Sequence, residues 1–167
     1  MNQPQTILSC YTLFWTRLFD IKGRSTRKEF WHPLWINAVI MTLLTLFAAE
    51  RASYIFGLLI FIPNLTVMTR RLHDVDRTMF LAILFNLSSY IAYFLIFLVA
   101  LVPTGIVTNP FAESILIITG FIGGIALIGL IFYTFVLMAS RGNDTSNEYG
   151  HGGTASMMQS TETPHAH

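Results

Sequence analysis

One short stretch of the sequence combines the side chains of acid–base chemistry with those that bind anions. It reads Arg70-Arg71-Leu72-His73-Asp74-Val75-Asp76-Arg77 and is called the Arg-His-Asp motif below. A histidine oriented by a carboxylate can act as a general base, and guanidiniums bind carboxylates or phosphates through paired hydrogen bonds. Adjacent residues such as His73 and Asp74 rarely have the geometry of such a pair, and no nucleophile is apparent. We therefore name no catalytic residue.

A second stretch, Gly23-Arg24-Ser25-Thr26-Arg27-Lys28-Glu29, has the pattern of a turn followed by the start of a helix. We call it the basic motif. Thr26 and Glu29 have the spacing of a capping box, and the basic side chains are of the kind that hold lipid phosphates at a membrane surface. The two motifs together form one candidate site, either a salt-bridge cluster or an anionic-lipid site. Its residues are Arg24, Arg27, Lys28, Glu29, Arg70, Arg71, His73, Asp74, Asp76 and Arg77.

Metal, cofactor and nucleic-acid chemistry have little support. The five histidines are scattered, no two lie four apart on one helix, and Cys10 is the single cysteine. Structural zinc sites need four such ligands, so we expect neither a metal nor a cofactor. The basic residues are few and accompanied by acids, unlike a duplex-binding surface, so we expect no nucleic-acid partner.

The elements that must position these motifs are membrane spans. Hydrophobic residues make up 53% of the chain and charged residues only 11%, against roughly a quarter charged in soluble domains. Four stretches contain no Asp, Glu, Lys or Arg, and a helix of roughly 20 residues crosses the hydrocarbon core. The predicted fold is therefore all-α and integral to the membrane, with one four-helix bundle over residues 31–140. Its expected spans are 31–49, 52–69, 79–102 and 114–140.

Residues 1–30 precede the first span and include an amphipathic pattern. Ile7, Tyr11, Phe14, Trp15 and Leu18 share one face of a helix, so we expect a cytoplasmic interfacial helix. A compatible alternative packs this face on the membrane helices of the same chain. Residues 141–167 are predicted to form a polar, disordered cytoplasmic tail.

The distribution of Lys and Arg predicts the orientation. The segments before the first span, between the second and third, and after the fourth hold 5 + 3 + 1 = 9 of them, and the opposite side holds only Arg51. Connections rich in Lys and Arg stay in the cytoplasm, so both termini are expected there.

Three motifs, at matching places relative to the spans, resemble a known family. They are Phe19–Trp31, which contains the basic motif, then Thr69–Arg77, and last Arg141-Gly-Asn-Asp-Thr-Ser-Asn-Glu-Tyr-Gly150. In this order they are similar to the bacterial inner-membrane family named domain of unknown function 805 (DUF805), over residues 14–152. The resemblance implies a multi-pass protein of the bacterial inner membrane. It implies no activity, because none is established for the family.

The fourth span contains a surface of small residues. Gly120 and Gly124 have Gly-x-x-x-Gly spacing, and Gly123 and Gly129 extend the surface. In lipid, small residues let helices approach closely, so these glycines are predicted to lie at a helix–helix contact, in the bundle or between subunits.

Three classes of function stay open. The first is a non-catalytic accessory, scaffold or lipid-associated membrane component, which fits the absence of charge deep in the spans. The second is a small oligomeric transporter or channel. The third is a membrane enzyme that acts on lipid headgroups through the Arg-His-Asp motif. The expected partners are membrane lipids, anionic ones among them, and either a larger membrane complex or further copies of the chain.

Overall fold

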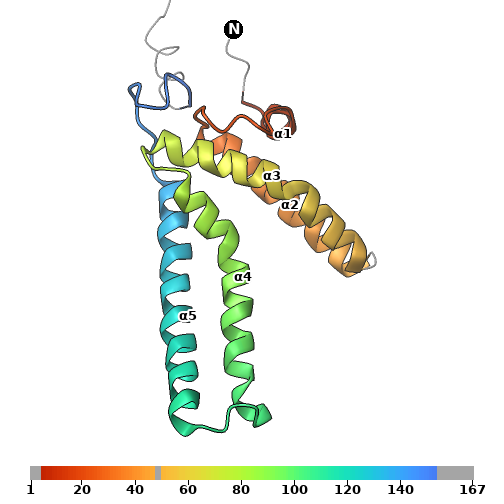
Figure 1. Ribbon diagram of the computed structural model, residues 1–167. Helices are drawn as coiled ribbons and strands as arrows, with labels where there is room; N and C mark the ends of the chain where they lie inside the picture. Colours follow the sequence, from red (N-terminus) through yellow and green to blue (C-terminus); the bar gives the residue numbers. More distant parts are fainter. Residues whose placement is uncertain (1–4, 48–49, 154–167) are drawn as a thin grey trace, which may run out of the picture. The chain divides into compact units, whose positions relative to one another are not determined.

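The computed structural model describes residues 5–47 and 50–153, and every regular element in this part of the chain is helical (Figure 1). The described residues form two compact units. The first runs to Ala82 and resumes at Leu137, and the second comprises Ile83–Val136. Each unit is described by itself below.

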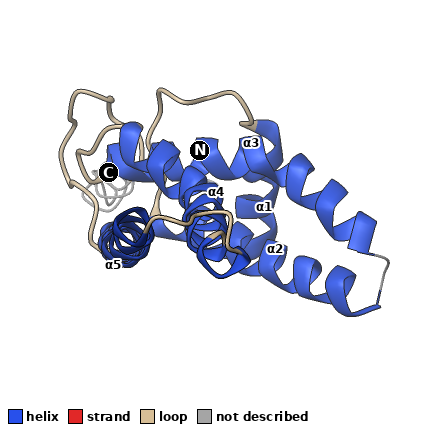
Figure 2. Ribbon diagram, turned by 60° about the horizontal axis from the view of Figure 1, so that its bottom comes forward, coloured by secondary structure: helices blue, strands red, loops and turns tan. Residues whose placement is uncertain are grey.

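The first unit is built on three helices, α1 (Ile7–Thr16), α2 (Arg27–Phe47) and α3 (Glu50–Asp74). The helices α2 and α3 lie side by side, and α1 packs against both (Figures 1 and 2). Cys10 and Phe14 are the buried residues of α1. Thr6 caps α1 by accepting a hydrogen bond from the backbone N–H of Ser9. The amphipathic helix expected from the sequence is therefore present, with its buried face on helices of the same chain.

Helix α2 begins earlier than the predicted span because its cap lies inside the basic motif. The Thr26 hydroxyl accepts the backbone N–H of Glu29 at 3.3 Å, as the Thr-x-x-Glu spacing predicts. Farther along α2, the buried Asn37 side chain accepts a hydrogen bond from the Tyr11 hydroxyl at 3.2 Å. This bond joins α1 to the apolar part of α2.

Helix α3 continues five residues beyond the predicted end of the second span. The sequence analysis places Arg70–Asp74 in a connection, whereas in the structure these residues form the last turns of α3. A helix can carry charges this far when each side chain finds partners, and the residues that supply these partners are described with the site. Asp76, with φ of 58°, then ends the helix in the left-handed region.

The end of α3 is a Schellman motif. The backbone N–H of Arg77 donates to the Leu72 carbonyl at 2.8 Å, and that of Asp76 donates to the His73 carbonyl at 3.2 Å. These two bonds satisfy carbonyls that the last helical turn leaves without helical partners. The position that glycine usually occupies in this motif is held by Asp76.

The second unit is a helical hairpin formed by α4 (Phe80–Ala100), a short 3₁₀ turn η1 (Val102–Thr104) and α5 (Pro110–Ala139). The first residues of α4 and the last residues of α5 belong to the first unit. Gly105 follows the turn in the left-handed region, with φ of 71°. Asn109 caps α5 through its side chain, which accepts the backbone N–H of Phe111 at 2.9 Å. A connection is thus present between the third and fourth predicted spans, and Pro110 is the first residue of α5.

Four of the described helices are long and apolar enough to cross a membrane, namely 27–47, 51–74, 80–104 and 110–139. The predicted all-α fold with four transmembrane helices is confirmed. The start of α2, the end of α3 and the start of α5 lie outside the predicted spans, because caps and buried polar partners extend these helices. The connection between the first two predicted spans lies partly outside the described residues.

Candidate functional site

The residues of the candidate site separate into a buried group and an exposed group. Exposed at the surface of the first unit are Arg27, Lys28, Asp76 and Arg77. Buried are Arg24, Glu29, Arg70, Arg71, His73 and Asp74. We call Arg24, Arg70, Arg71 and Asp74 the arginine cluster. The structure therefore brings together six of the ten predicted residues, from both motifs.

Arg24 joins the two predicted motifs to the C-terminal motif. Its Nε and one terminal nitrogen contact the same Asp74 oxygen, at 3.0 and 2.9 Å. The remaining N–H groups donate to backbone carbonyls, to Thr145 at 2.8 Å, to Gly150 at 3.1 Å and to Asn143. A guanidinium has five N–H donors, so each of them has an acceptor inside the chain.

Arg71 and Asp74 lie one helical turn apart on α3 and form an ion pair that is fully buried. The second Asp74 oxygen accepts from Arg71, so this carboxylate bridges two guanidiniums. Arg71 also donates to the carbonyls of Met138, at 3.1 Å, and Ser140. These carbonyls belong to the end of α5, where backbone acceptors lack helical partners. One side chain thus satisfies the terminus of another helix.

Arg70 is held by the segment before α2. Its Nε donates to the Ser25 hydroxyl at 2.8 Å, and a terminal nitrogen donates to the Arg17 carbonyl at 2.8 Å. In return, the Ser25 backbone N–H donates to the Arg70 carbonyl at 3.1 Å. Neutral oxygens therefore solvate this buried charge, while Asp20 and Glu29 supply the nearby negative charge.

His73 does not use Asp74 as an orienting acid. Its Nδ1 lies 3.3 Å from the Gly23 carbonyl, and its ring stacks on that of Tyr149 with centroids 3.7 Å apart and planes within 3° of parallel. The Asn147 side chain donates to the His73 carbonyl at 2.7 Å. The side-chain geometry of a histidine–aspartate base is absent from these two residues.

Glu29 serves the start of α2 and the N-terminal segment. It accepts from the Gln5 amide at 3.1 Å, and the same amide accepts from Thr26 through its carbonyl oxygen at 3.0 Å. Arg17 approaches Glu29 to 3.9 Å. The reciprocal half of the predicted capping box is therefore replaced by a glutamine, which sequence spacing alone could not indicate.

Asp20 fixes the turn that leads to the basic motif. It pairs with Arg17 at 2.6 Å and accepts the Gly23 backbone N–H at 3.2 Å. Partial burial by itself would raise the pKa of Asp20, but the hydrogen bond and charge of Arg17 outweigh burial and hold this pKa below its usual value. This carboxylate therefore stays ionised and keeps the turn closed at neutral pH.

The C-terminal motif is an ordered part of the site up to residue 153, in contrast to the disordered tail expected from Arg141 onward. Its order comes from backbone carbonyls that accept from Arg24 and from the Asn143 N–H, which donates to the Asp74 carbonyl at 2.8 Å. Gly153 adopts φ of 62°, and a side chain there would collide with the Asp74 carboxylate. Residues 154–167, the rest of the expected tail, lie outside the described part of the chain.

Sequence reasoning missed several members of the site. Ser25, Asn143, Thr145 and Gly153 were not among the predicted residues, and three of them contribute backbone groups that every residue type carries. A signal existed only for Gly153, because adjacent glycines often mark a close approach or a left-handed backbone. Among the described residues, no group of three His, Cys, Asp or Glu side chains is placed to hold a metal ion.

The four glycines of α5 have two kinds of surroundings within the second unit, close contact with α4 or open space. A side chain at Gly120 would collide with Val99 of α4, and one at Gly123 would come within 2.7 Å of Leu95. These two glycines lie at the predicted helix–helix contact. At Gly124 and Gly129 no atom lies within 4 Å of the place a Cβ would take, so the structure does not put them at such a contact. Gly124 instead lines a groove of about 850 Å³ between α4 and α5.

Comparison with known proteins agrees with this arrangement of motifs. A family model described as a protein of unknown function (DUF805) matches residues 18–151. The chain is 36% identical over 74 residues to the inner membrane protein YhaH of Escherichia coli K12, covering 38% of this chain and 61% of YhaH. YhaH of Escherichia coli O157:H7 matches equally.

The chain thus spans about three fifths of the length of these curated relatives. No solved structure matches it. The matched family region contains all the residues of the arginine cluster and the carbonyls that they bind, except that of Arg17. With most of its length matched by the family model, the chain belongs to the DUF805 family.

Proposed function

We propose that this protein is a non-catalytic, lipid-associated accessory or scaffold component of the bacterial inner membrane, in which the arginine cluster is a structural clasp. The observation that carries the proposal is the complete use of the Arg24 guanidinium inside the chain. A guanidinium whose donors all have acceptors has none left for a lipid phosphate or a reacting group. The side chains of Arg24, Arg71 and Asp74 are also fully buried.

The contacts of His73 also favour a non-catalytic role over the alternative of a headgroup enzyme acting through the Arg-His-Asp motif. A general base and its orienting acid need a direct hydrogen bond. Here Asp74 is engaged by two arginines and His73 by a backbone carbonyl. The ion pairs and hydrogen bonds of the cluster therefore hold the basic motif, the end of α3 and the C-terminal motif together.

The second unit supports an accessory role rather than a self-contained one. None of the most apolar window of α5 is buried within the protein. Such a hairpin is covered in the membrane by lipid or by the helices of another protein. The open positions at Gly124 and Gly129 leave room for a partner helix to approach closely. For the alternative of an oligomeric channel, the groove between α4 and α5 offers the polar side chains of Ser88 and Ser89. The Ser88 hydroxyl already donates to the Phe85 carbonyl at 2.6 Å.

Contacts within the first unit support the cytoplasmic location of both termini. The basic motif, the end of α3 and the C-terminal motif bind one another, so they share one side of the membrane. These segments carry the excess of Lys and Arg that marks the cytoplasmic side. Alkaline phosphatase fused after Gly153 should be inactive in a bacterial host, and a fusion at Arg51 should be active. The reverse pattern would overturn the orientation.

The proposed role is tested by gentle extraction of the protein from its native membrane, followed by native mass spectrometry. We expect a protein partner bound in a fixed stoichiometry. The clasp variant Arg24→Lys should destabilise the fold, so the partner should no longer bind. Recovery of the chain alone from membranes that retain their other complexes would contradict the accessory role. Turnover of a headgroup substrate by the purified protein would restore the enzyme alternative.

A further inference from the structure

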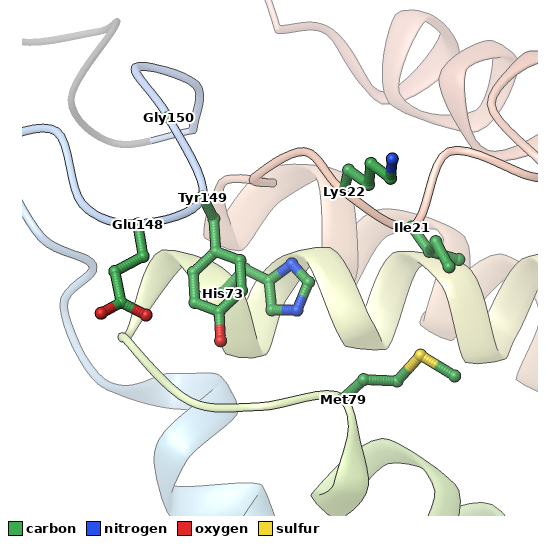
Figure 3. A pocket seen from close by; sticks show the side chains of 7 residues that line it. All are labelled: Ile21, Lys22, His73, Met79, Glu148, Tyr149 and Gly150. Atoms are coloured by element: carbon green, nitrogen blue, oxygen red, sulfur yellow. The ribbon is translucent and has the colours of Figure 1, made fainter.

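A cavity of about 500 Å³ lies beside the arginine cluster and is not used by the clasp (Figure 3). Four segments of the first unit line the cavity. They contribute Ile21 and Lys22, His73, Met79, and Glu148–Gly150. The cavity is therefore built by all three motifs and by the residue that precedes α4. Because it adjoins the ends of two spanning helices, it lies at the depth of lipid headgroups.

The protonation of His73 follows from its contact with Gly23. A backbone carbonyl can only accept, so the ring nitrogen 3.3 Å from the Gly23 oxygen, Nδ1, must donate. The neutral ring then carries its lone pair on Nε2. Figure 3 shows this second nitrogen on the side of the ring that faces Met79, and no hydrogen bond to it occurs among the described residues.

The imidazole is held rigidly in this orientation. His73 is only 6% exposed, and Tyr149 covers one of its faces at 3.7 Å. Tyr149 is fixed in turn, because its backbone N–H donates to the Asn147 side chain at 3.0 Å, while that side chain also donates to the His73 carbonyl. An acceptor that is oriented by its neighbours and directed into a cavity is a preorganised recognition group, since little freedom is lost on binding.

The polar groups around the cavity define the ligand that fits. Nε2 accepts, and the Glu148 carboxylate accepts and adds negative charge. Lys22 is part of the lining, and its ammonium is turned away from the stacked rings (Figure 3). Ile21 and Met79 supply apolar surface. A matching ligand has a cationic group with N–H donors for Nε2 and Glu148. It also has a phosphate for Lys22 and an apolar chain for Ile21 and Met79.

We propose that this cavity binds the headgroup of an aminophospholipid, with the primary ammonium donating a hydrogen bond to Nε2 of His73. The phosphate then lies at the rim on the side of Lys22, and the first acyl carbons lie against Ile21 and Met79. This inference deepens the lipid association in the proposed function and rests on it in that respect. It does not require a protein partner.

The test uses the purified full-length chain in detergent, titrated with phosphatidylethanolamine and with phosphatidylcholine of identical acyl chains, and read by native mass spectrometry. The two lipids carry the same charges and differ in the ammonium group, which in choline bears three methyl groups and has no N–H to donate. We expect phosphatidylethanolamine to bind roughly tenfold more tightly, because the choline lipid would cover this acceptor without giving it a partner. Equal binding of the two lipids would overturn the proposal.

Matched variants assign the selectivity to His73. Asn at position 73 keeps a side-chain N–H at the place of Nδ1 and removes Nε2, so His73→Asn should abolish the tenfold preference while the unfolding midpoint is retained. Should that variant fail to fold, Glu148→Gln, at an exposed position, should weaken phosphatidylethanolamine binding by about two- to fivefold. An unchanged preference in a folded His73→Asn protein, or unchanged phosphatidylethanolamine binding in Glu148→Gln, would count against the site.

Competition with soluble phosphoethanolamine distinguishes the source of the ligand. Failure to compete supports a lipid that needs its acyl chains, whereas displacement of the lipid at matched concentrations would overturn the lipid assignment in favour of a soluble phosphoamine. The lipid site and the accessory role can fail separately. Selective lipid binding without a protein partner in native membranes would contradict only the accessory role. A protein partner without selective lipid binding would contradict only the lipid site.

Discussion

Arg24 and Arg27 are three residues apart in one motif, yet the structure gives them opposite environments. Arg24 is 2% exposed and bound on every donor, whereas Arg27 is exposed at the first turn of α2. Burying a guanidinium is costly unless its hydrogen bonds are all satisfied. The difference between the two arginines therefore comes from the carbonyls of the C-terminal motif, which reach only one of them.

This contrast predicts different outcomes for the same conservative substitution. Arg24→Lys keeps the charge but cannot reach Asp74 and three carbonyls together, so it should lower the free energy of unfolding by about 3–5 kcal/mol. Arg27→Lys is the matched control and should leave stability unchanged. Both are measured by denaturant titration in detergent. Equal stability of the two variants would show that the clasp contributes nothing to the fold.

Cys10 offers a second residue-scale prediction because it is the single cysteine and is fully buried in α1. Burial raises the pKa of the Cys10 thiol, and the negative charge of Glu29 raises it further. At pH 8 the folded protein therefore holds less thiolate than free cysteine does, and the thiolate is the reactive form.

Maleimide labelling of Cys10 should accordingly be several-fold slower in the folded protein than after unfolding. The labelling rate should keep rising with pH beyond the range in which free cysteine levels off. Mass spectrometry of timed samples measures both rates. Labelling of the folded chain as fast as that of the unfolded chain would contradict the packing of α1 on α2 and α3.

At the scale of elements, the end of α3 is the main departure from sequence reasoning. Charged residues usually mark the limit of an apolar span, so the span was predicted to stop at Thr69, yet α3 runs to Asp74. The capping pair Thr26–Glu29 and the turn at Gly105 could be predicted because their signals are local. The partners of Arg70 and Arg71 could not, because most are backbone carbonyls from distant segments.

The helix end itself gives a prediction at Asp76. Its φ of 58° suits glycine better than any residue with a side chain. Asp76→Gly should therefore stabilise the protein by about 0.5–1 kcal/mol, and Asp76→Val should destabilise it by about 1–2 kcal/mol. The shift of the thermal unfolding midpoint measures both. A stabilising valine would rule out the Schellman end of α3.

At the scale of the whole molecule, the four spanning helices follow from composition, but the division into two compact units does not. The first unit is held by buried polar contacts that link segments up to 126 residues apart. The second unit is a local hairpin with an open groove. Hydropathy identifies every spanning helix and says nothing about which pairs of them pack, since all are similarly apolar.

Two glycines of α5 test the packing of the hairpin. Gly120→Leu should lower the thermal midpoint, because its side chain would overlap Val99, whose branched side chain has little rotamer freedom. Gly124→Leu, one turn away, enters open space in the groove and should leave the midpoint unchanged. Size-exclusion chromatography in detergent checks that both variants keep the same oligomeric state. The opposite order of stabilities would contradict the hairpin.

The long reach of Arg24 also sets an order of events during synthesis. Its carboxylate partner is translated 50 residues later, and its last carbonyl acceptor, Gly150, is translated 126 residues later. A nascent chain released by the ribosome before Asn143 therefore lacks all three carbonyls that bind this guanidinium. Premature termination, a frameshift or proteolytic clipping between residues 140 and 142 would leave all four spans intact and still mark the product as unfinished. Membrane quality-control proteases could act on that exposed charge.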